Sequence, residues 1–230
     1  MPNIFLVFGY GIPKDILKDE NYRIYLNTVF NKIYSISVKN PAAKLLIVFC
    51  GGATDMFKSH RRTEADEMIK FFSKLVKQRQ FLRPITKNWV FISENKSISS
   101  LENLLYGKRI IEKRKVKDGN VFIFCEQTRE KRIKIISKKI FDKDFYLRIV
   151  PVDFDITANR YLSPELIDKK EKHGIEYALS ALQSVEKLKK HHEFFARRLK
   201  ILREAGTKAH VETVGKFWES NTNDKYAKLF

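Results

Sequence analysis

The sequence contains little cysteine and no long apolar segment. Its two cysteines, Cys50 and Cys125, lie far apart, form no CxxC motif and each end an apolar run. This usage excludes a disulfide-rich fold and favours reduced, structural thiols. No apolar run approaches the ~20 residues that span a membrane, and the segment after Met1 lacks the basic start and cleavage site of a signal peptide. We therefore expect a cytoplasmic protein.

Acidic residues are scarce relative to basic ones. The chain has 27 Asp and Glu against 45 Lys and Arg, which gives a formal net charge of +18. A field of this sign attracts phosphates, nucleic acid or anionic lipid surfaces. The lysines are spread along expected helices and loops, and no DNA-reading motif is present. The charge is compatible both with a solvated lysine-rich surface and with a nucleic-acid partner.

Apolar residues make up 43% of the 230 residues, enough for one domain of ordinary size plus an appendage. Five short apolar runs are typical of buried strands. They are Asn3 to Phe8, Lys44 to Cys50, Trp89 to Ile92, Val121 to Cys125 and Phe145 to Val152. Segments with helical spacing alternate with them. The sequence therefore predicts a Rossmann-like α/β fold, with a mostly parallel sheet of about five strands and helices on both faces.

The composition changes after the fifth run. From about Pro164 the chain is highly charged, with apolar residues at helical spacing. We assign residues 1–158 to the α/β domain and 159–230 to a helical C-terminal appendage. These helices are expected to pack on the sheet or on another subunit, so a homo-oligomer is one prediction. His191 and His192 are neighbours that cannot point the same way on a helix, so no metal site is assigned.

Polar residues follow the predicted strands, and crossovers in a parallel sheet bring all strand carboxyl ends to one ligand-binding edge. The candidates are Gly9 and Gly11, Gly51 and Gly52, the segment Glu94 to Ser100, and Arg129 with Arg132. Glycines allow a ligand close to the backbone, although the three-glycine dinucleotide fingerprint is absent. Arg129 and Arg132 are three apart in the expected first turn of a helix. We predict that they form an anion clamp.

Carboxylates supply the remaining candidates. Thr63 and Asp66 resemble a capping box, which leaves Glu64 for a functional role. Ser99 or Ser100 can cap the next helix, and Ser97 faces the strand end. Glu64, Glu94 and Glu102 are the predicted catalytic residues, acting in acid/base chemistry or on ribose hydroxyls. Carboxylate-bound Mg²⁺ for phosphoester chemistry is compatible with this set.

Together these segments resemble the YdcF/SanA/ElyC-like domain family, a family of unknown function. The matches are Gly9, Gly11, Gly51, Gly52, Thr63, Glu64, Ala65, Met68, Glu94, Ser97, Ser99, Ser100, Glu102, Asn103 and Arg132. Ser99 and Ser100 replace the family's Asn-Thr, and Arg129 occupies the position of its histidine. An arginine stays charged at ordinary pH, so Arg129 cannot serve as the general acid or base that a histidine at this position could be. The resemblance covers residues 3 to 155.

The resemblance implies a soluble YdcF-like protein that binds a small anionic or nucleotide-like ligand at the strand ends. It also implies S-adenosylmethionine as one candidate ligand, and a hydrolase or transferase as candidate activities. The ligand-binding residues would then include Thr63, Ser97, Ser99, Ser100 and Asn103. Two alternatives stay open: a nucleic-acid-binding protein that uses its lysine-rich helices, and an envelope-related role as in SanA-like and ElyC-like members.

Overall fold

The computed structural model describes residues 1–9, 18–54, 62–153 and 162–222. At its centre is an all-parallel five-stranded sheet in the order β3-β2-β1-β4-β5. The strands are β1 (Asn3–Phe8), β2 (Leu45–Cys50), β3 (Trp89–Glu94), β4 (Gly119–Glu126) and β5 (Phe145–Val152). The predicted parallel sheet is confirmed. The strand order reverses between β1 and β4, so a crevice is expected beyond the carboxyl ends of these two strands.

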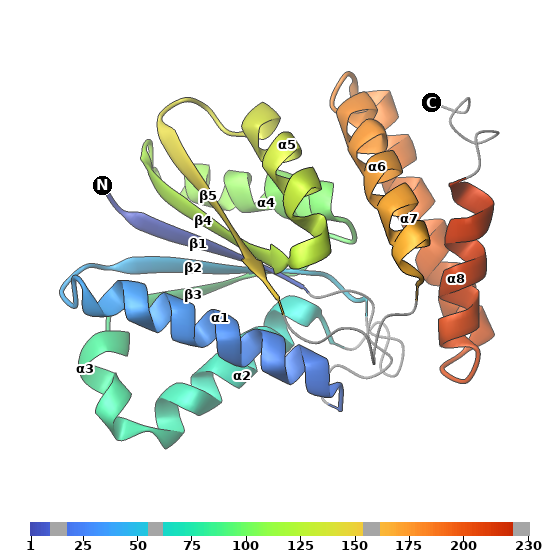
Figure 1. The fold of residues 1–230 in the computed structure, drawn as a ribbon. Coiled ribbons are helices and arrows are strands. Elements are labelled where there is room, and N and C mark those ends of the chain that lie inside the picture. The colour runs from blue at the N-terminus through green and yellow to red at the C-terminus, as the bar shows by residue number, and fades with distance from the viewer. Residues whose placement is uncertain (10–17, 55–61, 154–161, 223–230) are drawn as a thin grey trace.

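Helices cover both faces of the sheet, as predicted (Figure 1). On one face lie α1 (Glu20–Val38), α2 (Glu64–Gln78) and α3 (Arg83–Thr86), preceded by the 3-10 turn η1 (Gln80–Leu82). On the other lie α4 (Ser100–Lys113) and α5 (Glu130–Ile140). Side chains alternate across the central strand, so Phe5 packs with the first layer and Leu6 with the second. Each face therefore has its own apolar core.

The three C-terminal helices are α6 (Pro164–Ala181), α7 (Val185–Ala205) and α8 (His210–Asn221). Figure 1 shows them beyond the carboxyl ends of the strands and beside α5. Ala178 and Ala181 pack into the core under α4 and α5, while Phe194, Leu202 and Trp218 belong to a separate core between the helices. Much of their apolar surface is thus buried within the chain, and oligomerisation through these helices stays a prediction.

Two contacts attach α7 to the α/β part of the chain. Arg203 Nη2 donates a hydrogen bond to the carbonyl oxygen of Ala53, directly after β2. Near the other end of α7, His192 Nδ1 lies 2.7 Å from Glu102 Oε1 on α4. The C-terminal helices are therefore anchored at two points above the strand ends.

Cys50 and Cys125 are free, buried thiols at the ends of β2 and β4. Burial raises the pKa of Cys50, and it raises that of Cys125 to about 12. Both thiols stay protonated at neutral pH, which agrees with the predicted structural role. Across the described ranges, every helix is too short or too polar to cross a lipid bilayer.

Candidate functional site

A cavity of about 80 Å³ lies at the carboxyl ends of the strands. We call it the strand-end cavity. Its described lining residues are Gly9, Gly51, Thr54, Glu64, Ser97, Ile98, Ser99, Ser100, Asn103, Arg129, Arg132, Lys170, Phe195, Arg198 and Trp218. The predicted strand-end residues Gly52, Thr63, Glu94 and Glu102 are absent from this lining, and Gly11 lies outside the described residues. Most of the predicted site is thus brought together in one place.

The start of α2 places Glu64 in the cavity. Thr63 Oγ1 accepts a hydrogen bond from the backbone N–H of Asp66 at 3.2 Å and donates one to its carboxylate at 2.6 Å. These two residues form the predicted cap. The backbone N–H of Glu64 donates to the carbonyl of Gly52 at 3.0 Å, so the first turn of α2 is folded against the glycine loop after β2. The cap thereby leaves the Glu64 side chain for the cavity.

The Glu64 carboxylate is held tightly although it lines a cavity. Glu64 is only 4% exposed, and the Tyr22 hydroxyl group donates a hydrogen bond of 2.8 Å to Glu64 Oε1. A Cβ atom placed on Gly9 would lie 2.4 Å from Glu64 Oε2, well inside any normal contact. Gly9 is therefore needed because its missing side chain leaves space for this carboxylate.

Glu94 and Glu102 form hydrogen bonds with the loop between β3 and α4. Glu94 Oε1 accepts from the backbone N–H groups of Lys96 and Ser97 at 2.9 and 3.1 Å, and Ser97 Oγ donates to Oε2. Burial raises the pKa of Glu94, and these hydrogen bonds oppose that effect. Glu102 Oε2 accepts from the backbone N–H of Ile98 at 2.7 Å. Both carboxylates shape the loop that forms one wall of the cavity.

The first turn of α4 supplies small polar groups to the cavity. Ser99 is the N-cap, and its Oγ accepts from the backbone N–H of Glu102 at 3.2 Å. This is one of the two caps that the sequence allowed. Ser100 Oγ accepts a hydrogen bond from Arg132 Nη2 at 3.3 Å, and Asn103 also lines the cavity. The helix N-terminus and Arg132 thus meet at the same wall.

Arg129 and Arg132 both reach the cavity, but from successive elements rather than from one helical turn. Arg129 ends the 3-10 turn η2 (Gln127–Arg129), and its Nη1 donates to the carbonyl of Gly9 at 3.1 Å. Burial acts to lower the pKa of Arg129, but Glu126, Glu171 and Glu64 together raise it. This guanidinium is therefore fixed and charged at the end of β1.

Arg132 lies in the first turn of α5 and is 8% exposed. Its Nε is 3.0 Å from Glu171 Oε2 on α6, although the two groups are not aligned for a hydrogen bond. Burial lowers the pKa of Arg132, which Glu171 opposes. A Cβ atom on Gly174 would lie 2.8 Å from Arg132 Nη1, so this glycine on α6 leaves space for the guanidinium.

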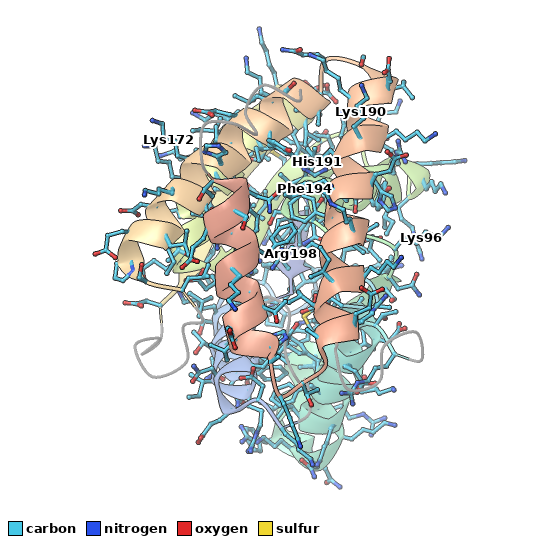
Figure 2. All side chains as sticks on the ribbon, turned by 90° about the vertical axis from the view of Figure 1, so that its right-hand side faces the viewer. Lys96, Lys172, Lys190, His191, Phe194 and Arg198 are labelled. Carbon is cyan, nitrogen blue, oxygen red and sulfur yellow. The ribbon has the colours of Figure 1, made fainter. Side chains whose placement is uncertain are left out.

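The C-terminal helices contribute a cation that the sequence analysis missed. Figure 2 shows Arg198 in a row with His191 and Phe194, on the side of α7 that faces α6 and α8. Arg198 Cζ lies 5.0 Å from the ring centre of Trp218 and 6.0 Å from those of Phe195 and Phe217. Its Nε is buried without a hydrogen-bond partner, and no described carboxylate pairs with it.

Burial lowers the pKa of Arg198, and the nearby charges of Arg129 and Arg132 add to this effect. A buried cation without a counter-charge is costly, so it is a marker of function. The sequence does hold a signal for it. Phe194, Phe195 and Leu202 lie four, three and four residues away, which places Arg198 on the apolar face of α7.

Lys170 on α6 is the second cation missed from the sequence. Its Nζ lies 3.0 Å from Glu171 Oε1, and its side chain is 15% exposed. Burial lowers the pKa of Lys170 to about 8; Glu171 opposes this shift, whereas Arg132 and Arg129 reinforce it. Lys170 thus carries a positive charge at pH 7 that is easily lost in mild alkali.

Four cations therefore line the cavity, namely Arg129, Arg132, Lys170 and Arg198, and Glu64 is the carboxylate among its described lining residues. Such a site can hold an anion through charge-assisted hydrogen bonds. Within the described ranges, no group of three or more His, Cys, Asp or Glu side chains is placed to hold a metal ion.

Comparison of the chain with models of protein families, with curated proteins and with solved structures finds no match. The resemblance to the YdcF/SanA/ElyC-like family stays a prediction that depends on the strand-end motifs.

Proposed function

We propose that this protein binds a small anion of phosphate size and charge in the strand-end cavity. The observation that carries the proposal is Arg198. Its guanidinium lies over three aromatic rings and pairs with no described carboxylate, and it shares a cavity with Arg129, Arg132 and Lys170. Glu171 pairs with Arg132 and Lys170, whereas no described carboxylate pairs with Arg198. A phosphate group bound in the cavity would offset the charge of Arg198.

The volume of the cavity supports a short ligand. About 80 Å³ is several times the ~10–15 Å³ that one water requires, but below the ~300–1,000 Å³ of pockets for drug-sized ligands. A phosphate group with a short substituent suits this space. S-adenosylmethionine or a nucleotide is larger than this space and would extend beyond it.

The reaction class that we propose is hydrolysis or transfer at a phosphoryl group. Arg129, Arg132 and Arg198 would stabilise the charge on the phosphoryl oxygens, as cations do in phosphoryl transfer. Glu64 would act as the general base that takes the proton of the attacking hydroxyl or water, and this proton would pass to the leaving alcohol oxygen as its P–O bond breaks. In this proposal Glu94 and Glu102 are positioning residues, because their oxygens bind the loop that precedes α4.

Calorimetric titration with inorganic phosphate tests the proposal. Replacing Arg198 with glutamine should weaken binding by about tenfold to a hundredfold, since one charge-assisted hydrogen bond contributes ~1.5–3 kcal/mol. Arg198→Lys should recover part of the loss, because the planar fork is missing. Arg197→Gln is the matched control: it removes the same charge one residue away, from an exposed side chain.

Two results would refute the proposal. The first is phosphate binding of equal strength in wild type and Arg198→Gln. The second is an equal loss in both variants, which would assign binding to the general positive charge.

A nucleic-acid partner is the second candidate, and the charge of +18 favours it. Lys96, Lys172 and Lys190 are exposed and surround the C-terminal helices in Figure 2. Binding of short RNA or DNA that weakens steeply with salt, with no phosphate binding in calorimetry, would favour this candidate.

A further inference from the structure

A second cavity of about 20 Å³ adjoins the strand-end cavity. The two share Ser99, Ser100, Arg132, Phe195 and Trp218 in their linings. The second cavity also includes residues of α6 and α7, among them His173 and His191, and we call it the histidine compartment. The two cavities are therefore neighbours that share part of their walls.

Two imidazole nitrogens of the compartment lack partners. His191 is 3% exposed, and its Nδ1 is buried without a hydrogen-bond partner among the described residues. The Nε2 of His173 is buried and unpartnered in the same way. Buried polar groups of folded proteins almost always have a partner. Both residues line the histidine compartment, so a ligand group or an ordered water there would supply the missing partners.

The other walls of the compartment are mainly apolar. Leu101, Ile136, Tyr177 and Phe194 contribute to them. The ring of His191 packs at 4.8 Å from Phe195 and 6.4 Å from Tyr177, which fixes its position. Burial lowers the pKa of His191 to about 4, and Arg132 and His192 add to this effect. The imidazole is therefore neutral at pH 7, so one ring nitrogen is a donor and the other an acceptor.

We propose that the histidine compartment receives a short, uncharged polar arm of the ligand whose anionic group occupies the strand-end cavity. The ligand class is then a small phosphorylated compound with a hydroxyl or carbonyl group, hydrogen-bonded by His191 or His173. This inference rests on the proposed anion binding and specifies the ligand. A volume of about 20 Å³ holds one or two groups the size of a water, which favours a short arm over a nucleobase. A charged arm is disfavoured because it would lose its hydration against apolar walls.

The test compares matched ligands by calorimetry on the full chain. The ligands are inorganic phosphate, ethyl phosphate, 2-hydroxyethyl phosphate, propyl phosphate and 3-hydroxypropyl phosphate. Wild type should prefer the hydroxylated member of at least one pair by about fivefold to tenfold, the effect of one hydrogen bond. His191→Phe keeps the ring and removes the nitrogens, so it should lose this preference while retaining its affinity for inorganic phosphate. His191→Asn should keep part of the preference.

The outcomes separate the two proposals. If wild type binds phosphate but binds each hydroxyalkyl phosphate no more tightly than the matching alkyl phosphate, only the proposal for the histidine compartment is overturned. The same proposal is overturned if His191→Phe and His173→Phe both keep the full preference for the hydroxylated ligand. Absence of phosphate binding by wild type would overturn both proposals. If His191→Phe does not fold, the wild-type comparison of the ligand pairs still decides the matter.

Discussion

Replacing Arg198 with methionine should raise the stability of the ligand-free protein and lower its affinity for an anion. In the folded chain this guanidinium is partly buried, its Nε has no hydrogen-bond partner, and no described carboxylate pairs with it. Removing a cation from water costs several kcal/mol for a fully buried group, and less for a partly exposed one. The cation–π contact with the Trp218 ring at 5.0 Å offsets ~0.5–2 kcal/mol of this cost.

Methionine keeps an unbranched side chain that can fill the space among the aromatic rings. We expect the free energy of unfolding to rise by ~1–2 kcal/mol, and the melting temperature to rise by ~2–4 °C per kcal/mol for a chain of this size. Phosphate affinity should fall about tenfold to a hundredfold in the same variant. A gain in stability with a loss of binding is typical of functional sites.

Stability is measured by thermal denaturation at pH 7 without phosphate, with circular dichroism as the signal. Phosphate affinity is measured by calorimetry. Arg197→Met is the control, because Arg197 is exposed and loses only a surface contact with the Phe194 ring, so its change should be a loss of at most about 1 kcal/mol. A lower melting temperature for Arg198→Met with unchanged phosphate affinity would refute the reasoning. Arg198 would then stabilise the aromatic core and have no ligand.

Gly9→Ala should lower the free energy of unfolding by ~1–3 kcal/mol in denaturant unfolding, because the new methyl group would lie 2.4 Å from Glu64 Oε2. The control is Gly215→Ala, whose methyl group meets no atom within 4 Å. A loss of stability in the control, or no loss in Gly9→Ala, would contradict this prediction. Sulfate affinity should fall between pH 7 and 9, because Lys170, with a pKa of about 8, loses its charge as the pH rises. Lys170→Met should bind weakly at both pH values and show less of this fall. The control Lys172→Met changes an exposed neighbour and should keep the full fall in sulfate affinity, as measured by calorimetry. An unchanged fall in Lys170→Met would disprove the assignment of this pH dependence to Lys170.

Local patterns were enough to predict the sheet and several caps. The run from Ile4 to Phe8 is continuously apolar, and in the structure these residues are fully buried in the central strand. The caps formed by Thr63 and Ser99 depend on residues three positions away in sequence. Each of these features is decided within one short window, where hydrophobicity and hydrogen bonding to the nearest backbone act.

The strand-end motifs predicted a ligand site at the carboxyl edge of the sheet, and the strand-end cavity lies at that edge. Ligand binding there and the resemblance stay predictions. Glu94 and Glu102 bind loop backbone groups, and His192 from α7 contacts Glu102. The N–H groups that Glu94 and Glu102 bind lie two to four residues away and are local, whereas the contact between Glu102 and His192 joins residues 90 positions apart. The cap formed by Thr63 and Asp66 already set Glu64 apart in the sequence, and in the fold Glu64 is the carboxylate among the described lining residues of the cavity.

The sequence by itself determined the strands, the caps and the gathering of strand ends, because these follow from neighbouring residues and from the handedness of parallel crossovers. Tertiary structure alone decided that Lys170 and Arg198 join Arg129 and Arg132 around one cavity. It also decided the size of that cavity and the unpartnered nitrogen of His191. These properties arise where α6, α7 and α8 pack over residues more than a hundred positions earlier, such as Gly9 and Glu64, and no local pattern specifies that packing.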